Sequence, residues 1–232
     1  MHFLKMKDIG RLFDSISNRY DRFNHTASMG IDRCWRRRAI KSLTKCDSVL
    51  DVAAGTADLC IEAIRRGKSQ KVIGVDISEG MLDVGREKVR RKGMSDKIEL
   101  FVADCAHLPF DDNTFDAVTC GYGVRNFAEL DQSLAEIFRV LKPGGQLRIL
   151  EFTYPTNKLV RFFYDFYFTR IVPRIGKRLT DNGEAFVYFM QSVKSFAKGR
   201  DFVAILERNG FCDTSFKSQT FGISTLYKGC KR

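Results

Sequence analysis

Short apolar runs alternate with amphipathic stretches along the first two thirds of the chain. Five runs have the length and composition of buried strands, and they occupy residues 45–54, 71–78, 97–104, 114–121 and 146–152. Three stretches between them have helical spacing, and these are residues 56–66, 78–91 and 130–141. The alternation predicts βαβ units, a parallel sheet and right-handed crossovers.

The N-terminal region precedes this alternation and has helical spacing. It predicts two helices, near residues 8–23 and 30–44, with a break near residues 24–28. Lys and Arg number eleven in residues 1–45 against four acidic residues, a net charge of +7. We therefore expect a basic helical extension before the sheet.

The alternation is interrupted again at residues 152–195, where eight aromatic residues fall between 152 and 168. It resumes with a predicted helix at 196–208 and two predicted strands near 211–217 and 221–229. The expected fold is α/β, with a central, mostly parallel seven-stranded sheet and helices on both faces.

A length of 232 residues suits one domain with some decoration. We expect a helical extension at 1–45, a cofactor-binding core at 46–151, an inserted aromatic helical cap at 152–195, and a C-terminal helix and strands at 196–232.

The composition is that of a soluble globular protein with an excess of basic residues. Lys and Arg number 39 against 28 Asp and Glu, so the net charge is +11. Such a charge suits nucleic acid, an anionic membrane surface or an anionic ligand, and charge alone does not choose among them.

The cysteines and histidines predict neither a disulfide framework nor a metal site. The seven cysteines are odd in number, lack Cys-x-x-Cys spacing, and fit a reducing compartment. The three histidines are far apart, so no metal is expected. The N-terminus carries charges where a signal peptide needs an apolar core, and no run approaches the ~18 apolar residues of a membrane span. We expect a cytoplasmic protein, with contact to the inner face of the membrane as the alternative to a fully soluble one.

Acidic residues end three successive predicted strands: Asp51, Asp76 and Asp104. Ligands of open parallel sheets bind outside the carboxyl ends of the strands. The loop at 51–58, Asp-Val-Ala-Ala-Gly-Thr-Ala-Asp, is rich in small residues and permits close approach of a ligand. Asp76 follows Gly55 by 21 residues, close to the spacing at which an acid meets a ribose diol. The residues predict a nucleotide site, and on this ground alone NAD stays open while NADP is disfavoured.

Several motifs together resemble a known enzyme class. DVAAGTAD at 51–58, GVDISEGML at 74–82, ADCAHLPFDDNTFDAVT at 103–119 and RVLKPGG at 139–145 are similar to the motif series of class I S-adenosylmethionine-dependent methyltransferases, which have a Rossmann-like fold. RYDRFN at 19–24, GYGVRNF at 121–127 and LRILEF at 147–152 resemble, more narrowly, the menaquinone/ubiquinone biosynthesis C-methyltransferase family.

The resemblance implies S-adenosylmethionine as the cofactor, without a metal. Thr56 and the 53–57 backbone, including Gly55, would hold the methionine part beside Gly121. The Asp51 carboxylate would organise this loop and face the amino group through water. The family usually has glycine where this chain has Ala54 and Ala57, and each alanine adds a methyl where backbone and cofactor would meet.

The nucleoside part of the cofactor is assigned by the same resemblance. Asp76 would bind the ribose hydroxyls, and Ile77 and Met81 would flank the adenine. Asp104 and Cys105 would lie at the adenine edge.

The family methylates a ring carbon of a polyprenylated hydroquinone. Such a reaction needs a proton acceptor and a donor that stabilises the ring oxyanion. By position, Arg125 would be that donor and Asn126 would orient the ring or the arginine. Asp165 is a candidate proton acceptor. An ordinary ion pair is the alternative for Arg125, and arginine pairing or solvation is the equal alternative for Asp165.

The aromatic residues have a role in this function, because an isoprenoid tail needs an apolar channel. The candidate substrate-binding residues are Tyr20, Phe162, Phe163, Phe166 and Tyr188. Packing of a helical cap is the alternative interpretation. Basic residues among the aromatics also suit an anionic membrane surface.

The sequence thus favours methylation of demethylmenaquinol, with the ubiquinone-pathway benzoquinol as the close alternative. An RNA methyltransferase, a non-catalytic quinone or lipid carrier, and an NAD enzyme are further hypotheses. The expected partners are a prenylated quinol and a membrane surface; a homodimer is a further candidate, and no nucleic acid is expected.

Overall fold

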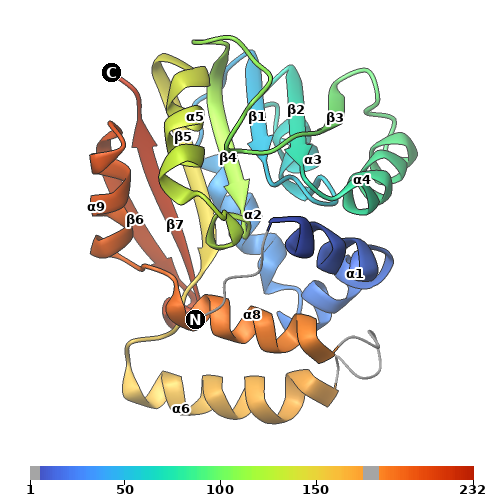
Figure 1. The fold of residues 1–232 in the computed structure, drawn as a ribbon, viewed down its shortest axis with the longest axis vertical. Coiled ribbons are helices and arrows are strands. Elements are labelled where there is room, and N and C mark those ends of the chain that lie inside the picture. Colours follow the sequence, from blue (N-terminus) through green and yellow to red (C-terminus); the bar gives the residue numbers. More distant parts are fainter. Residues whose placement is uncertain (1–5, 175–182) are drawn as a thin grey trace.

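Seven strands form one sheet in the computed structural model, which describes residues 6–174 and 183–232 (Figure 1). The strands are β1 Ser48–Val52, β2 Lys71–Asp76, β3 Ile98–Val102, β4 Phe115–Gly121, β5 Leu141–Phe152, β6 Cys212–Gln219 and β7 Ser224–Cys230. Their order is β3-β2-β1-β4-β5-β7-β6, and β7 runs in the direction opposite to the other six strands. The predicted mostly parallel, seven-stranded sheet is confirmed.

Helices cover both faces of this sheet, as the alternating pattern predicts. One face is covered by α5 (Leu130–Val140) and α9 (Arg200–Arg208), whose apolar residues form one core with the strands. The apolar residues of α2 (Ile31–Lys41), α3 (Asp58–Arg65) and α4 (Glu79–Arg91) form a second core cluster with β1, β2 and β3. Ser78 caps α4 as expected, since its hydroxyl accepts a hydrogen bond from the amide of Met81.

Two local predictions differ from the structure. The first helix, α1, spans Met6–Ala27, so the predicted break at 24–28 is wrong. The chain turns instead at Ser28–Gly30, where Met29 and Gly30 have positive φ angles of 51° and 75°. The strand predicted at 146–152 belongs to β5, which already begins at Leu141, and its register with β4 jumps from Leu141 to Gln146. Residues 142–145 therefore form a bulge that separates two paired segments.

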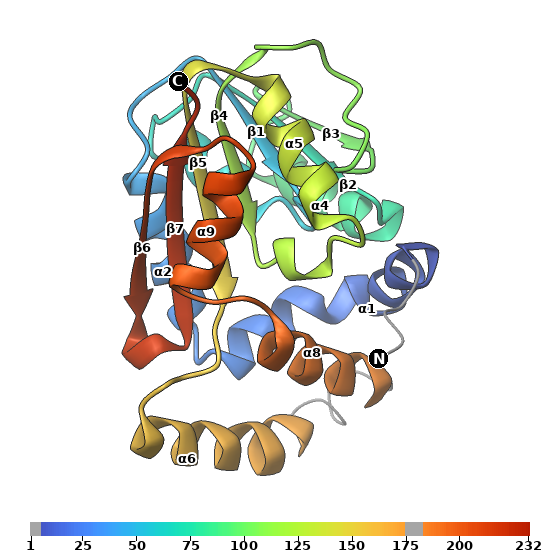
Figure 2. The same cartoon turned by 60° about the vertical axis from the view of Figure 1, so that its left-hand side comes forward.

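Helices from both ends of the sequence lie below the carboxyl ends of the parallel strands. Figures 1 and 2 show α1 and α8 (Gly183–Ser195) crossing this end of the sheet, with α6 (Lys158–Phe166) as the outermost layer beneath α8. A π-helical turn at Tyr167–Ile171 continues α6. The predicted cap at 152–195 thus contains helices where it is described, and its residues 175–182 lie outside the described residues.

Candidate active site

A cavity of about 420 Å³ lies between α1 and the carboxyl ends of β1, β2 and β4. Its lining comes from six elements and loops that are distant in the sequence. The lining residues are Phe13, Tyr20, Ala53, Gly55, Asp76, Ile77, Met81, Asp104, Cys105, Ala106, Gly121, Tyr122, Gly123, Asn126, Phe127, Ala128, Glu129 and Ser133. The cavity therefore lies at the end of the sheet that the strand-end acids predict.

Asp76 ties the two cofactor loops together at the end of β2. Its Oδ2 accepts a hydrogen bond of 2.8 Å from the amide of Gly55, and its Oδ1 accepts one of 2.9 Å from the amide of Ser78. Burial raises the pKa of Asp76, and these backbone donors act against that rise. The carboxylate also lines the cavity, so it remains accessible to hydroxyl donors of a bound ligand.

The four residues predicted for the adenine side lie together in the wall of this cavity. Ile77, Met81, Asp104 and Cys105 all line the cavity. The Oδ1 atom of Asp104 accepts a hydrogen bond from the amide of Ala106, which fixes the carboxylate at the end of β3. Burial raises the pKa of the Cys105 thiol, so Cys105 is neutral and contributes shape instead of charge.

Asp51 lies behind the loop instead of on the main cavity wall. It is 1% exposed and accepts hydrogen bonds from the Thr119 hydroxyl (2.6 Å) and the Cys60 thiol (3.2 Å). Burial raises the pKa of Asp51 to about 7, although both hydrogen bonds act against the rise. Asp51 also lines a small pocket that shares Tyr20, Ala53, Gly55 and Gly121 with the main cavity. From the family resemblance, the amino-acid end of the cofactor is expected in this pocket.

Thr56 anchors the N-terminal helix over the site. Its hydroxyl donates a hydrogen bond of 2.6 Å to Asp21 of α1 and accepts one of 3.0 Å from Lys88 of α4. Lys88 Nζ also lies 2.6 Å from Asp21 Oδ2 and 2.7 Å from Asp58 Oδ1. Two turns earlier in α1, Asp14 accepts hydrogen bonds from the Ser78 hydroxyl and the Gly80 amide. These contacts hold α1 as a lid along the cofactor loop.

The two alanines that replace family glycines do not fill the main cavity. Ala57 is fully buried in the apolar core with α3 and adopts a positive φ of 63°, which an alanine does at a cost. Ala54 does not have a positive φ, so an alanine causes no backbone strain at this position. A Cβ added to Gly74 would lie 2.9 Å from the Cβ of Ala54. The methyl group of Ala54 therefore occupies space that is open only because residue 74 is glycine.

Arg125 does not line the cavity and is held in a buried ion pair. Its Nη1 lies 2.6 Å from Glu151 Oε1, and its guanidinium stacks 5.6 Å and 5.2 Å from the ring centres of Phe152 and Phe189. Burial raises the pKa of Glu151, while the Arg125 guanidinium and the amides of Arg125 and Phe152 act against that rise. Arg125 Nε is buried without a hydrogen-bond partner among the described residues, so one donor of this guanidinium is unused behind the cavity wall.

Tyr20 and Asn126 line the cavity, and Tyr188 contacts Asn126 from α8. Asn126 lines the cavity, and its Oδ1 accepts a hydrogen bond of 3.1 Å from the Tyr188 hydroxyl of α8. Tyr20 lines the cavity from α1. Burial raises the pKa of the Tyr20 hydroxyl, and the Arg125 charge acts against the rise, which places the two groups near each other. Three predicted residues from three distant segments thus converge here.

Asp165, Phe162 and Phe166 lie away from this cavity. The Asp165 carboxylate accepts a hydrogen bond of 2.7 Å from the Tyr154 hydroxyl and lies 3.8 Å from Lys194, a lysine where the alternative prediction named an arginine. Phe162 and Phe166 are 67% and 55% exposed on the outer face of α6. Asp165 does not line this cavity, so its role as proton acceptor stays a prediction, and the two phenylalanines lie on the surface.

A second, more apolar cavity of about 390 Å³ lies between the cap and the N-terminal helices. It is lined by Phe23, Asn24, Ala27, Ser28, Met29, Ile31, Trp35, Phe152, Leu159, Val160, Phe163, Tyr164, Tyr167, Phe168, Phe189, Thr220, Phe221 and Ile223. Phe152 in this wall stacks on Tyr122 in the wall of the first cavity, with ring centres 4.2 Å apart. One stacked pair therefore contributes to the walls of both cavities.

Sequence reasoning missed several residues of the site. Glu151 ends β5 as Asp51, Asp76 and Asp104 end or follow their strands, so the strand-end rule that found those three also predicts Glu151. Phe13, Phe127, Glu129 and Ser133 line the cavity from helices and loops, and no sequence pattern marks them.

The comparison with known families shows which family the chain belongs to. The model of the ubiE/COQ5 methyltransferase family matches residues 1–231. The chain belongs to this family. A demethylmenaquinone methyltransferase of Bacteroides fragilis is 43% identical over 98% of this chain and 94% of its own length. A ubiquinone/menaquinone biosynthesis C-methyltransferase of Geobacter sulfurreducens is also 43% identical, over 98% of this chain and 90% of its own length.

Solved structures agree with the fold of this ubiE/COQ5 family member. A possible histamine N-methyltransferase of Thermotoga maritima superposes with a TM-score of 0.67 at 16% identity, covering 97% of this chain and all of the other. A phosphoethanolamine N-methyltransferase of Haemonchus contortus, solved with S-adenosyl-L-methionine, gives 0.60 at 18% identity, covering 82% of this chain and 49% of the other. At such identities the likeness supports the class I methyltransferase fold alone.

Proposed function

We propose that this protein transfers a methyl group from S-adenosylmethionine to a ring carbon of a polyprenylated hydroquinone, demethylmenaquinol first of all. The observation that carries the proposal is the cavity at the strand ends, where Asp76, Asp104 and the 53–57 loop meet Tyr20 and Asn126. The names of the relatives from Bacteroides and Geobacter support this substrate class, and the second keeps the ubiquinone-pathway benzoquinol as the alternative.

The residues present fit S-adenosylmethionine. Asp76 presents a carboxylate to the cavity while backbone amides hold it, as recognition of a ribose diol requires. Ile77 and Met81 provide apolar walls, and Asp104 provides an acceptor for an exocyclic amine. The small pocket at Asp51 would take the methionine end. When bound, the cofactor supplies an electrophilic methyl sulfonium.

The chain itself would position the quinol and exclude water. The lid helix α1 and the cap helix α8 close the cavity side that faces away from the sheet, and Tyr20 and Asn126 present polar groups there. We assign the Nε donor of Arg125 to the developing ring oxyanion, with Glu151 and two aromatic rings fixing the guanidinium. Because Arg125 does not line the cavity, this assignment requires the wall beside Asn126 to open when the quinol binds. Holding the ring carbon in line with the methyl supplies most of the rate through orientation.

The second cavity would hold the start of the isoprenoid tail. Its wall is mostly aromatic and aliphatic, and the Tyr122–Phe152 pair joins it to the cofactor cavity. Of the predicted substrate residues, Phe163 lines it. Met29 and Phe221 also line it and are 72% and 81% exposed, so its mouth is itself apolar.

An anionic membrane surface would deliver this substrate. None of the described helices is long and apolar enough to cross a bilayer. The outer face of α6 exposes Phe162 and Phe166, and basic residues accompany it at Lys158, Arg161 and Arg170. Basic residues near an anionic leaflet contribute about 1 kcal/mol each. The exposed aromatics would enter the interface beside the mouth of the second cavity.

Transfer of labelled methyl groups tests the reaction. The purified protein is given methyl-labelled S-adenosylmethionine with reduced demethylmenaquinone or the demethyl benzoquinol in liposomes, and the extracted lipids are counted. We expect label in the menaquinone product. Label only in the benzoquinone would select the alternative substrate. Confirmed cofactor binding with no label in either lipid would refute quinol methylation.

Arg125→Lys tests the oxyanion assignment, because lysine keeps the charge but loses the forked donor geometry. We expect turnover to fall at least about tenfold with cofactor affinity changed less than about threefold, as loss of one donor predicts. Arg208→Lys is the control, since Arg208 forms an exposed ion pair with Asp131. Wild-type turnover in Arg125→Lys would remove Arg125 from the mechanism.

A paired substitution tests the membrane face. Phe162→Ser with Phe166→Ser removes two side chains that each contribute about 1.5–3 kcal/mol when buried in an apolar phase, so vesicle binding should fall at least about tenfold. Turnover of a short-chain soluble quinol should stay unchanged. Phe101→Ser, at an exposed phenylalanine of β3, is the matched control. Equal vesicle binding by both proteins would refute α6 as the membrane face.

A further inference from the structure

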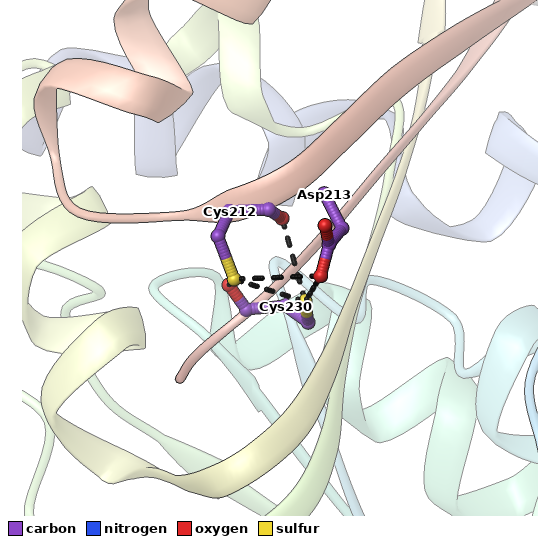
Figure 3. Close-up of side chains that lie close together, drawn as sticks. All are labelled: Cys212, Asp213 and Cys230. Carbon is purple, nitrogen blue, oxygen red and sulfur yellow. Dashed lines mark hydrogen bonds between the residues drawn. The ribbon is translucent and has the colours of Figure 1, made fainter.

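Two cysteines that are 18 residues apart meet at the end of the sheet opposite the candidate active site. Cys212 is the first residue of β6 and Cys230 the last residue of β7, and the two are direct cross-strand partners. Their Sγ atoms lie 3.2 Å apart (Figure 3). Figure 1 shows this end of β7 at the top of the sheet, far from α1 and α8. Spacing rules for metal motifs miss such a pair, because its members come from two strands.

A carboxylate is aimed at this pair by an irregular piece of backbone. The register of β6 with β7 shifts between Cys212 and Ser215, and Asp213 in this bulge has a φ of 47°. Bulges re-aim side chains, and Asp is one of the few residues that tolerates a left-handed conformation. Asp213 Oδ2 lies 3.2 Å from Cys230 Sγ and 3.8 Å from Cys212 Sγ. Arg232 lies 3.9 Å from the other oxygen, Oδ1, so Oδ2 is left facing the sulfurs.

The three ligand atoms lie close enough together for one small divalent ion to contact all of them. A regular tetrahedron with zinc–sulfur bonds of about 2.3 Å needs its sulfurs about 3.8 Å apart, so binding would move the two sulfurs slightly apart. The two sulfurs and Oδ2 form a triangle with sides of 3.2, 3.2 and 3.8 Å. A point about 2.3 Å from each corner lies just above such a triangle, and that is the length of a zinc–sulfur bond. Two thiolates and one carboxylate are ligands that Zn²⁺ accepts. Among the described residues, no fourth His, Cys, Asp or Glu joins the group.

We propose that Cys212, Asp213 and Cys230 form a zinc-binding site with three protein ligands and an open fourth position. The site joins the first residue of the edge strand β6 to the last residue of β7, so a bound ion would staple the edge of the sheet. It would therefore act on the stability of the C-terminal hairpin and leave methyl transfer at the other end of the sheet unchanged. A water molecule or a donor from another molecule would complete the tetrahedron.

A disulfide is the competing outcome for this cysteine pair, and the carboxylate argues against it. A disulfide uses two sulfurs and gives Asp213 no role, whereas a divalent cation uses all three groups and offsets two of their three negative charges. A bound divalent ion removes the thiol protons itself.

Metal titration of the full chain tests the proposal. Protein reduced and stripped with a chelator is titrated with Zn²⁺ while its melting temperature is followed. Free Zn²⁺ about a hundredfold above the dissociation constant should raise the melting temperature by about 5–10 °C. Co²⁺ serves as a spectroscopic probe, and we expect sulfur-to-cobalt charge transfer with the visible bands of a tetrahedral ion.

Three variants separate metal binding from a structural role. Cys230→Ser should abolish the charge-transfer band, and Asp213→Asn should weaken Zn²⁺ at least tenfold. Asp213→Gly removes the ligand but suits the positive φ, so its metal-free melting temperature should match or exceed that of the wild type while its response to Zn²⁺ disappears. Cys34→Ser, at an exposed cysteine outside the cluster, should behave as the wild type.

Two results would overturn the proposal. One is a wild-type response to Zn²⁺ and Co²⁺ in Cys230→Ser or Asp213→Gly, which would place any bound metal elsewhere. The other is the absence of a cobalt–thiolate band in the reduced wild type. Mass spectrometry of the protein purified in air then shows whether the pair is a disulfide instead, since that bond joins the Cys212 and Cys230 peptides and lowers their summed mass by two hydrogens.

Discussion

Replacement of Asp76 is the most direct test of the cofactor site. In the proposed complex its carboxylate accepts two charge-assisted hydrogen bonds from the ribose, each contributing about 1.5–3 kcal/mol. Asp76→Ala should therefore cost about 3–6 kcal/mol, or a loss of about 10² to 10⁴ in affinity. The variant also leaves the amides of Gly55 and Ser78 without their acceptor, which adds to the cost because both belong to the cofactor loops.

Asp76→Asn divides this loss into its parts. The amide keeps one acceptor oxygen but places an NH₂ group against one of the two backbone donors, so the charge and one loop contact are lost together. We expect it to bind S-adenosylmethionine more tightly than Asp76→Ala and at least about tenfold more weakly than the wild type.

Calorimetric titration with S-adenosylmethionine and S-adenosylhomocysteine measures these affinities, and circular dichroism checks folding. Glu79→Gln is the matched control, because Glu79 lies three residues further along and pairs with Arg86 at an exposed position. Its affinity should stay within about twofold of the wild type. Folded Asp76→Ala that binds within threefold of the wild type would refute the assignment of Asp76.

Three further perturbations test the loop, the lid and the buried acid. Lys88→Met removes the cation shared by Asp21 and Asp58. We expect the free energy of unfolding to fall by about 2 kcal/mol, the melting temperature to fall by about 4–8 °C, and proteolysis within α1 to become faster. Lys92→Met, at an exposed lysine, is the control. Gly123→Ala places a Cβ 2.4 Å from that of Ala53, so we expect about 1–3 kcal/mol of destabilisation by thermal melting and weaker cofactor binding. The pKa of Asp51 is raised by burial to about 7, so its stabilising contribution is present below about pH 4 and is lost as pH rises through 7. Apo wild-type stability should therefore fall by about 2–4 kcal/mol more than that of Asp51→Asn between pH 4 and 8, and parallel pH profiles in urea titrations would contradict this.

The cofactor half of the site is predictable because one local rule positions it. Strands of a parallel sheet end at one edge, so acids that end successive strands must gather there whatever the rest of the chain does. Asp76 and Asp104 line the cavity for this reason, and Asp51 lies just behind it. The same rule predicts Glu151 at the end of β5, where it pairs with Arg125.

The substrate half depends on contacts between distant segments, and no local rule predicts them. Asn126 meets Tyr188 across 62 residues of sequence, and Arg125 meets Glu151 across 26. Asp165 is a plausible acid in isolation, but it pairs with Tyr154 and Lys194 and does not line the cavity. The cysteine pair shows the same limit, because only the pairing of β6 with β7 joins Cys212 to Cys230.

The aromatic cap shows why periodicity alone left its function open. Tyr164 and Phe168 are four residues apart, stack at 4.2 Å and are buried, whereas Phe162 and Phe166 are four residues apart and exposed. Two aromatic stripes thus run along opposite faces of one helix, and spacing cannot say which one faces the protein. The structure answers this, since α6 is the outermost layer and has protein on one side only (Figure 2). Exposed apolar side chains that gather on one face mark interaction sites in many proteins. The proposed quinol carries an isoprenoid tail that is itself held in a membrane, and for this reason we propose a bilayer as the partner of this stripe.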